Sequence, residues 1–140
     1  MTLNPGANIV LDNFVNAGNL NIKNSFNVPG FFGNTGSIYV TGSGEIIGDI
    51  SGGASFNIGI DSAGNNLSNT LHISSTLTNF DFINVKNGLL TTSDTSNLSG
   101  IGDLYIAKNV TAVFNGNYSS DGVVVNEGVL YINKGFSADT

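Results

Sequence analysis

A short pattern of alternating apolar residues recurs along most of this chain at a near-constant spacing, and this recurrence constrains the fold more than any other feature. Its copies begin at Leu20, Ile38, Phe56, Leu71, Leu89 and Leu104, and a later copy begins at Leu130. The spacing between consecutive copies among the first six takes one of two similar values. The longer spacing separates Leu20 from Ile38, for example, and the shorter one separates Phe56 from Leu71. Alternation with period two places the apolar side chains on one face of a strand. Repeats of this length are typical of solenoids, in which neighbouring units stack to close a shared core.

The residues between the strand-like segments favour turns and disfavour helices. The 140-residue chain contains 19 Gly and 22 Asn, the two residues that most readily adopt the positive φ angles of tight corners. Asn87-Gly88 and Asn115-Gly116 are examples of such corners. No window shows sustained helical periodicity. The sequence therefore predicts an all-β fold.

Two all-β architectures fit the alternation, a parallel β-solenoid (β-helix) of about seven coils and a β-sandwich. Both have one dry and one wet face, but a sandwich gives no reason for a repeat at so regular a spacing. The spacing therefore favours the solenoid. We expect its core stack to include Leu20, Ile38, Phe56, Leu71, Leu104 and Leu130. Asn residues at equivalent corners of successive coils are expected to hydrogen-bond to one another along the stack.

We expect residues 1–140 to form a single solenoid domain. Residues 1–35 fit the repeat less well than the rest, and we expect them to form a cap or irregular first coils. Residues 134–140 follow a good strand without a polar capping element. Because solenoid ends need caps, we expect the chain to be a segment of a longer surface protein or a unit that stacks end to end on copies of itself.

Charge and composition exclude several classes of function. The net charge is −6, and all four cationic side chains are Lys. Nucleic-acid binding is excluded because phosphate neutralisation needs clustered cations. We expect no membrane insertion, since no segment has the ~18 apolar residues of a span. Without Cys, the chain has no disulfides and no thiolate metal site. No cofactor or metal is predicted, because repeated calcium-binding motifs are also missing from the sequence.

Three phrases resemble the passenger regions of bacterial autotransporters, the type V-secreted surface proteins, and of related filamentous adhesins. They are the glycine-flanked GSIYVTGSG at 36–44, IGDLYIAKNV at 101–110 and DGVVVNEGVLYI at 121–132. The resemblance lies in composition and repeat, and it covers residues 36–136. It implies a right-handed parallel β-helix, export through the outer membrane, an extracellular location at the bacterial cell surface, and a role in adhesion or as a stalk.

Tyr39, Tyr105 and Tyr131 occupy the same position in their strand segments, directly after Ile or Leu. They are predicted to point outward and to form an aromatic row that contacts a sugar or a protein. The alternative is that they only pack against neighbours on the outer face. His72, the one imidazole, is also predicted to lie on the outer face, as a solvated residue without a catalytic partner.

Paired carboxylates are the remaining candidate for chemistry. In-register stacking of coils would bring Asp81 near Asp103, or Asp49 near Asp61, and glycan-cleaving enzymes use such pairs. The alternative is that sparse acidic residues keep an Asn-rich surface soluble. We therefore predict a non-enzymatic stalk or adhesin, with a self-assembling filament subunit and a glycan-active β-helix hydrolase or lyase as alternatives. The expected partners are a protein or glycan on a host or neighbouring cell, or copies of the chain itself.

Overall fold

A computed structural model describes residues 1–3, 9–10, 14–23, 26–28, 32–74 and 76–139. Within this part of the chain the fold is all-β, with 66% of residues in strands and no helix, and parallel coils stack into a β-solenoid of about six turns. Every pairing between the named strands is parallel. The predicted solenoid is therefore confirmed, and the β-sandwich, which pairs its strands antiparallel, is wrong.

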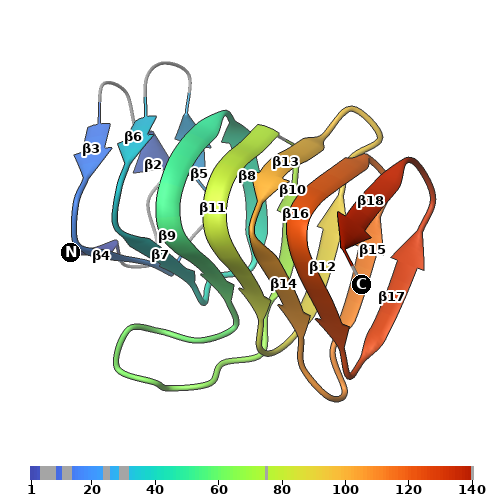
Figure 1. Cartoon of the computed structure of the whole chain (residues 1–140). Coiled ribbons are helices and arrows are strands. Elements are labelled where there is room, and N and C mark those ends of the chain that lie inside the picture. The colour runs from blue at the N-terminus through green and yellow to red at the C-terminus, as the bar shows by residue number, and fades with distance from the viewer. Residues whose placement is uncertain (4–8, 11–13, 24–25, 29–31, 75, 140) are drawn as a thin grey trace.

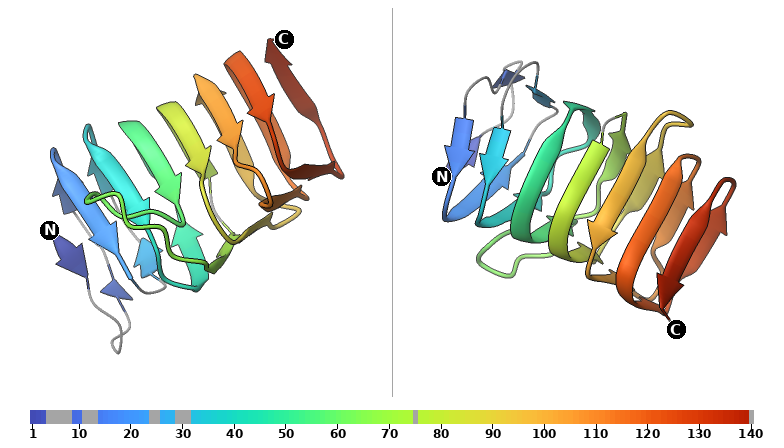
Figure 2. Two further views of the ribbon diagram at one scale, coloured as in Figure 1. Left: turned by 90° about the horizontal axis from the view of Figure 1, so that it is seen from below. Right: turned by 45° about the horizontal axis from the view of Figure 1, so that its top comes forward.

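Each coil has three sides, which we call the first, second and third faces. The second face is a sheet with one strand from each coil: β2 (Ile9–Val10), β5 (Phe26–Val28), β8 (Gly44–Gly48), β10 (Thr70–Ile73), β12 (Leu89–Thr92), β15 (Thr111–Phe114) and β17 (Val129–Ile132). The structure has about six turns where the sequence predicted about seven coils, because the seven copies of the apolar pattern come from two faces of the coil. Figure 2 shows the coils following one another from the N-terminus to the C-terminus.

The other two faces belong to one bent sheet. Three of its strands, β9 (Ile50–Ile58), β11 (Thr76–Val85) and β16 (Asn117–Asn126), run from the third face round to the first. Further strands of the first face are β1 (Thr2–Leu3), β4 (Asn19–Ile22), β7 (Ser37–Val40) and β14 (Asp103–Ile106). Those of the third face are β3 (Phe14–Asn16), β6 (Phe32–Asn34), β13 (Asn97–Ile101) and β18 (Phe136–Asp139).

A column of left-handed residues forms the bend between the third and first faces. Gly52, Asn79 and Gly100 have φ angles of 82°, 60° and 63°. Thr78 is the strand partner of both Ser51 and Ser99, so these three residues are aligned. Gly52, Asn79 and Gly100 are the residues that directly follow them, and they therefore lie at the same place in their coils. Gly and Asn adopt this conformation at the lowest cost. The excess of these two residues therefore supplies a bend at the same place in successive coils.

The repeat found in the sequence combines two different faces. On the first face, Leu20, Ile38 and Phe56 are aligned, and the row continues at longer and unequal steps through Ile83, Leu104 and Val124. Leu71 and Leu130 lie instead on the second face, in a row with Leu90 and Ala112. The prediction of one stack containing Leu71 and Leu130 is therefore wrong, because the shorter steps of the repeat pass between faces.

The predicted core residues nevertheless point inward. Leu20, Ile38, Phe56, Leu71 and Leu104 are each 0% exposed, whereas Leu130 in the last coil is only partly buried. In β12 it is Leu90 rather than Leu89 that faces the core. The longest step, between Phe56 and Ile83, includes a loop of residues 59–69, drawn in green below the stack in Figure 1.

Asparagine side chains bond along the stack, as predicted. The Asn16 amide donates to Oδ1 of Asn34 at 2.7 Å, and Asn133 donates to Oδ1 of Asn115 at 2.7 Å. The first of these bonds is buried, so it satisfies polar groups that water cannot reach. β3 also pairs with β6 in register, so these residues before 36 belong to the regular ladder. The rest of the N-terminal segment lies partly outside the described residues.

Candidate functional site

The outer surface of the first face has a row of bonded hydroxyl and amide groups, which we call the amide–hydroxyl row: Ser37, Ser55, Asn57 and Asn84. Ser55 donates to Ser37 at 2.9 Å, Asn57 donates to Ser55 at 2.8 Å, and Asn84 donates to Asn57 at 2.8 Å. Asn57 is only 6% exposed and also donates to the Ile38 carbonyl at 3.2 Å. This bonding fixes the four side chains in one arrangement on the outer surface.

Three aromatic side chains flank the amide–hydroxyl row. Tyr39 is the partner of Asn57, Tyr105 is the partner of Asn84, and Phe82 is the partner of Ser55. Phe82 is 47% exposed although it is large and apolar. Tyr105 is held by two charged neighbours, because Lys86 Nζ lies 4.3 Å from its ring centroid and its hydroxyl donates to Glu127 at 3.3 Å. Loss of hydration and the Glu127 carboxylate both raise the pKa of Tyr105.

Hydrogen bonds fasten the 59–69 loop to the coils beside the amide–hydroxyl row. Ser62 accepts a bond from the Asn21 amide at 2.8 Å, and its backbone N–H donates to Asn21 Oδ1 at 2.8 Å. Within the loop, Asp61 accepts bonds from the Asn65 side chain and from the backbone N–H groups of Asn65 and Ala63. These bonds lower the pKa of Asp61, with the Asn65 side chain as the largest cause.

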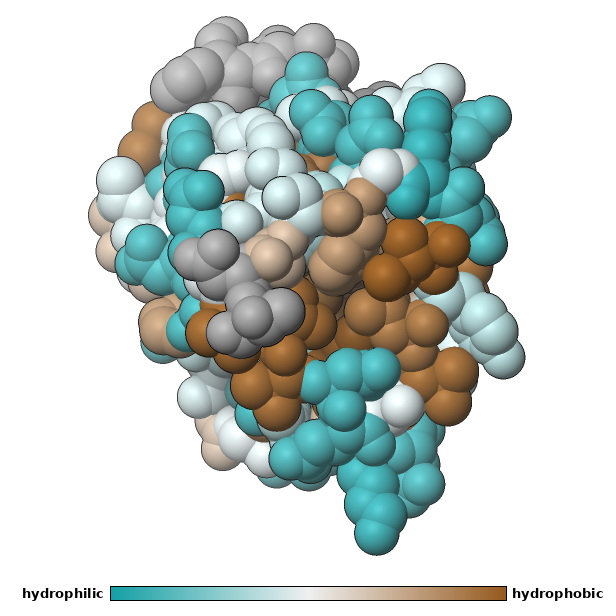
Figure 3. All heavy atoms as spheres, turned by 45° about the vertical axis from the view of Figure 1, so that its right-hand side comes forward, coloured by the Kyte–Doolittle hydropathy of each residue, from teal (hydrophilic) through white to brown (hydrophobic). Residues whose placement is uncertain are grey.

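The last coil forms a second candidate surface, because its inward positions are incompletely covered. Val124, Leu130, Phe136 and Ala138 are only partly buried, and Ile132 is 46% exposed. Equivalent residues one coil earlier are covered; Leu104 and Ala112 are 0% exposed. Figure 3 shows hydrophobic residues gathered on this end of the molecule. The surface is therefore a section through the solenoid core.

An aromatic stack reaches this open end. The Phe114 and Tyr118 rings lie 5.4 Å apart, and the Tyr118 and Phe136 rings lie 4.7 Å apart at an interplanar angle of 18°. The Tyr118 hydroxyl is buried, and burial raises the pKa of this side chain. The stack ends on the partly buried Phe136 ring.

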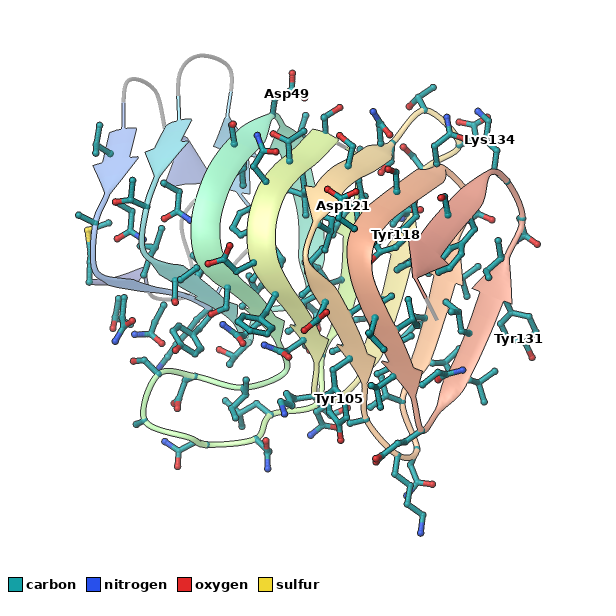
Figure 4. The ribbon with its side chains drawn as sticks, in the orientation of Figure 1. Asp49, Tyr105, Tyr118, Asp121, Tyr131 and Lys134 are labelled. Atoms are coloured by element: carbon teal, nitrogen blue, oxygen red, sulfur yellow. The ribbon has the colours of Figure 1, made fainter. Side chains whose placement is uncertain are left out.

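The predicted row of three tyrosines is wrong. Tyr39 and Tyr105 share one row of the first face, but Asn57 and Asn84 lie between them. Tyr131 lies in β17 of the second face, opposite Val113, and Figure 4 shows it on a different side of the molecule from Tyr105. The error has the same cause as the mixed core stack, since equivalent strand positions recur on two faces. Tyr131 does point outward, with 56% of its surface exposed.

His72 lies on the outer face of β10, as predicted. Its Nδ1 is 2.7 Å from the Thr91 hydroxyl, and Glu45 is its partner on the other neighbouring strand. The Glu45 carboxylate bonds to Ser74 rather than to the imidazole. These two bonds, His72 with Thr91 and Ser74 with Glu45, are therefore cross-strand contacts of the outer sheet surface.

The predicted carboxylate pairs are not brought together as facing residues. Asp103 is the partner of Phe82 and accepts a bond from the Val123 N–H at 2.8 Å, whereas Asp81 lies one residue earlier on β11. Asp49 accepts a bond from the Thr76 N–H, on the opposite side of the molecule from the loop that contains Asp61. Each of Asp49, Asp61 and Asp103 thus accepts backbone bonds in a local structural role.

The exposed Phe82 was not identified from the sequence, although a signal for it was present. Ile83 and Val85 are buried, so Phe82 and Asn84 must point outward by alternation. The bend earlier in β11 interrupts the alternation of inward and outward side chains. Phe80 faces inward before Phe82 faces outward, although simple alternation would place both on the same side. Counting back from Val85 would have placed Phe82 on the surface.

No group of three or more His, Asp or Glu side chains that could hold a metal ion occurs in the part of the chain that the structure describes. The same part of the chain contains no helix long and apolar enough to cross a membrane. In comparisons with known proteins, no family model, curated protein or solved structure matches this chain.

Proposed function

We propose that this chain is a non-enzymatic structural segment of a secreted bacterial surface protein, where it acts as a stalk or adhesin. The proposal is supported chiefly by the parallel ladder, in which successive coils place partners such as Ile83 and Leu104, or Leu71 and Leu90, in register. A stack of this kind is lengthened by adding coils in the same register. The function is therefore mechanical: a ladder-bonded stack that extends coil by coil and displays its outer faces.

Duplication of one coil tests this role. A second copy of residues 117–134 is inserted between Lys134 and Gly135, which matches the step from Tyr118 to its partner Phe136. We expect the added coil to cover the original Leu130 and Ile132, because the ladder and core then continue by one repeat. Amide hydrogen exchange should slow along the original β17, and the free energy of unfolding should rise.

The control for this insertion carries the same residues in scrambled order and should leave β17 unprotected. If the true duplicate exchanges as an unfolded chain and β17 is unchanged, the last coil does not accept another coil. The proposed role as an extensible segment would then be wrong.

End-to-end self-assembly is the second candidate, and the exposed Ile132 specifically favours it. Parallel stacking of one copy on the next is a head-to-tail contact, which produces open filaments. Light scattering and negative-stain microscopy over a concentration series test this. We expect rods that lengthen at constant width and are abolished by Ile132→Lys, whereas Ile47→Lys, at a 43% exposed position in a middle coil, has no effect. A constant mass of 14.5 kDa would contradict self-assembly.

A further inference from the structure

We propose that the outer surface of the first face binds a neutral oligosaccharide, with Phe82 as the ring on which a sugar packs and Asn84 as its main hydrogen-bonding group. This deepens the proposed role as an adhesin by naming the class of ligand. The site lies on β11, where Asn84 belongs to the amide–hydroxyl row and has Tyr105 as its partner on the next strand.

Phe82 supplies the apolar contact. An aromatic ring has a negative face, which attracts the weakly positive C–H groups that line one side of a pyranose ring. Phe82 is 47% exposed on a paired strand, and its neighbours on the two adjacent strands are Ser55 and Asp103. The strand is fixed by ladder bonds on both sides, so binding orders little additional backbone.

Asn84 supplies the polar contact. It is half-buried and donates one amide hydrogen to Asn57, which is itself held by Ser55 and the Ile38 carbonyl. Among the described residues, the Asn84 Oδ1 accepts no bond, so a carbonyl and one N–H hydrogen remain for the ligand. Adjacent sugar hydroxyls can both donate and accept, and therefore match this pair.

The size of the surface favours an oligosaccharide over a single sugar. Tyr39 and Tyr105 lie on either side of Asn57 and Asn84, three strand spacings apart, which corresponds to about 14 Å. Tyr105 cannot rotate freely, because Lys86 covers its ring and Glu127 holds its hydroxyl. Tyr105 therefore limits the site at one end.

Charge favours a neutral ligand. The groups of the amide–hydroxyl row are uncharged, and the nearest cation, Lys86, is already paired with the Tyr105 ring. Asp103 and Glu127 lie at the margin, and the chain as a whole carries −6. Sialylated or sulfated glycans would be repelled by this surface.

A printed array of neutral, sialylated and sulfated oligosaccharides, probed with the fluorescently labelled chain, tests the proposal. We expect retention on neutral members only. The Phe82→Ala and Asn84→Ala variants should each lose at least tenfold in affinity for the retained glycans, and Phe82→Tyr should keep most of it. Tyr131→Ala, which removes a 56% exposed aromatic ring from the second face, should bind like the parent chain.

Circular dichroism and the urea midpoint show whether each variant is folded, and Asn84→Ala tests the site if Phe82→Ala does not fold. The proposal is overturned if no neutral glycan is retained, if only acidic glycans are retained, or if Tyr131→Ala loses as much affinity as Phe82→Ala. These outcomes leave the coil-duplication result unaffected, since that result depends on β17 exchange and not on sugar binding.

Discussion

Individual glycines fix how closely successive coils can approach. Gly88 has a φ of +86°, and a Cβ added there would collide with the backbone carbonyl of Asn69 in the preceding coil. Gly64 in the 59–69 loop has nearly the same φ, +88°, but nothing lies within 4 Å of its added Cβ. The two residues separate the conformational cost of Ala from its steric cost.

We therefore predict that Gly88→Ala destabilises the chain by about 3 kcal/mol or more, because strain at positive φ adds to a backbone collision. Gly64→Ala should cost about 1–2 kcal/mol, from the φ angle alone. Urea denaturation of both variants measures the difference. Equal losses would show that the stack has room at the Asn87-Gly88 corner and that the coils are not closely packed there.

The 59–69 loop is the element whose stability should depend on pH. Hydrogen bonds from Asn65 hold the pKa of Asp61 below its ordinary value of 3.8. A lowered pKa in the folded state means that the carboxylate stabilises the loop fully above pH 3.8 and loses this contribution as the pH falls through the lower, folded-state value.

NMR titration of the Asp61 carboxyl and the Asn65 amide checks this prediction. Both signals should move together with a midpoint below 3.8, and Asp61→Asn should remove the transition at Asn65. A midpoint at or above 3.8 would mean that the charged form gains nothing from the loop bonds.

At the scale of elements, alternation predicted individual strands well but could not assign them to faces. Leu71 and Ile73 face inward as expected, and so do Leu104 and Ile106. The two strands lie on different faces because one coil contains several strands of similar pattern. The 59–69 loop further disturbs the spacing. The candidate surfaces were less predictable, since Asn57 and Asn84 become neighbours only through the long step that includes this loop.

At the scale of the whole molecule, the same side chain should matter less at the open end than in the middle. Leu104 is 0% exposed between two coils, whereas Leu130 in the last coil is partly buried. We predict that Leu104→Ala costs about 3–4 kcal/mol and that Leu130→Ala costs at most about half as much, because less buried surface is lost. Equal losses in urea denaturation would show that Leu130 is fully covered in solution.

Inter-strand NOEs measured by NMR are the most direct test of the parallel, three-faced stack. We predict methyl contacts between Leu71 and Leu90 and between Ile83 and Leu104, the aligned pairs of the second and first faces. Short Hα–Hα contacts between strands should be missing, because these arise from antiparallel pairs. The exception is the Ile60–Asn66 bridge within the loop. Hα–Hα contacts between successive strands of the chain would contradict the parallel stack and favour a β-sandwich.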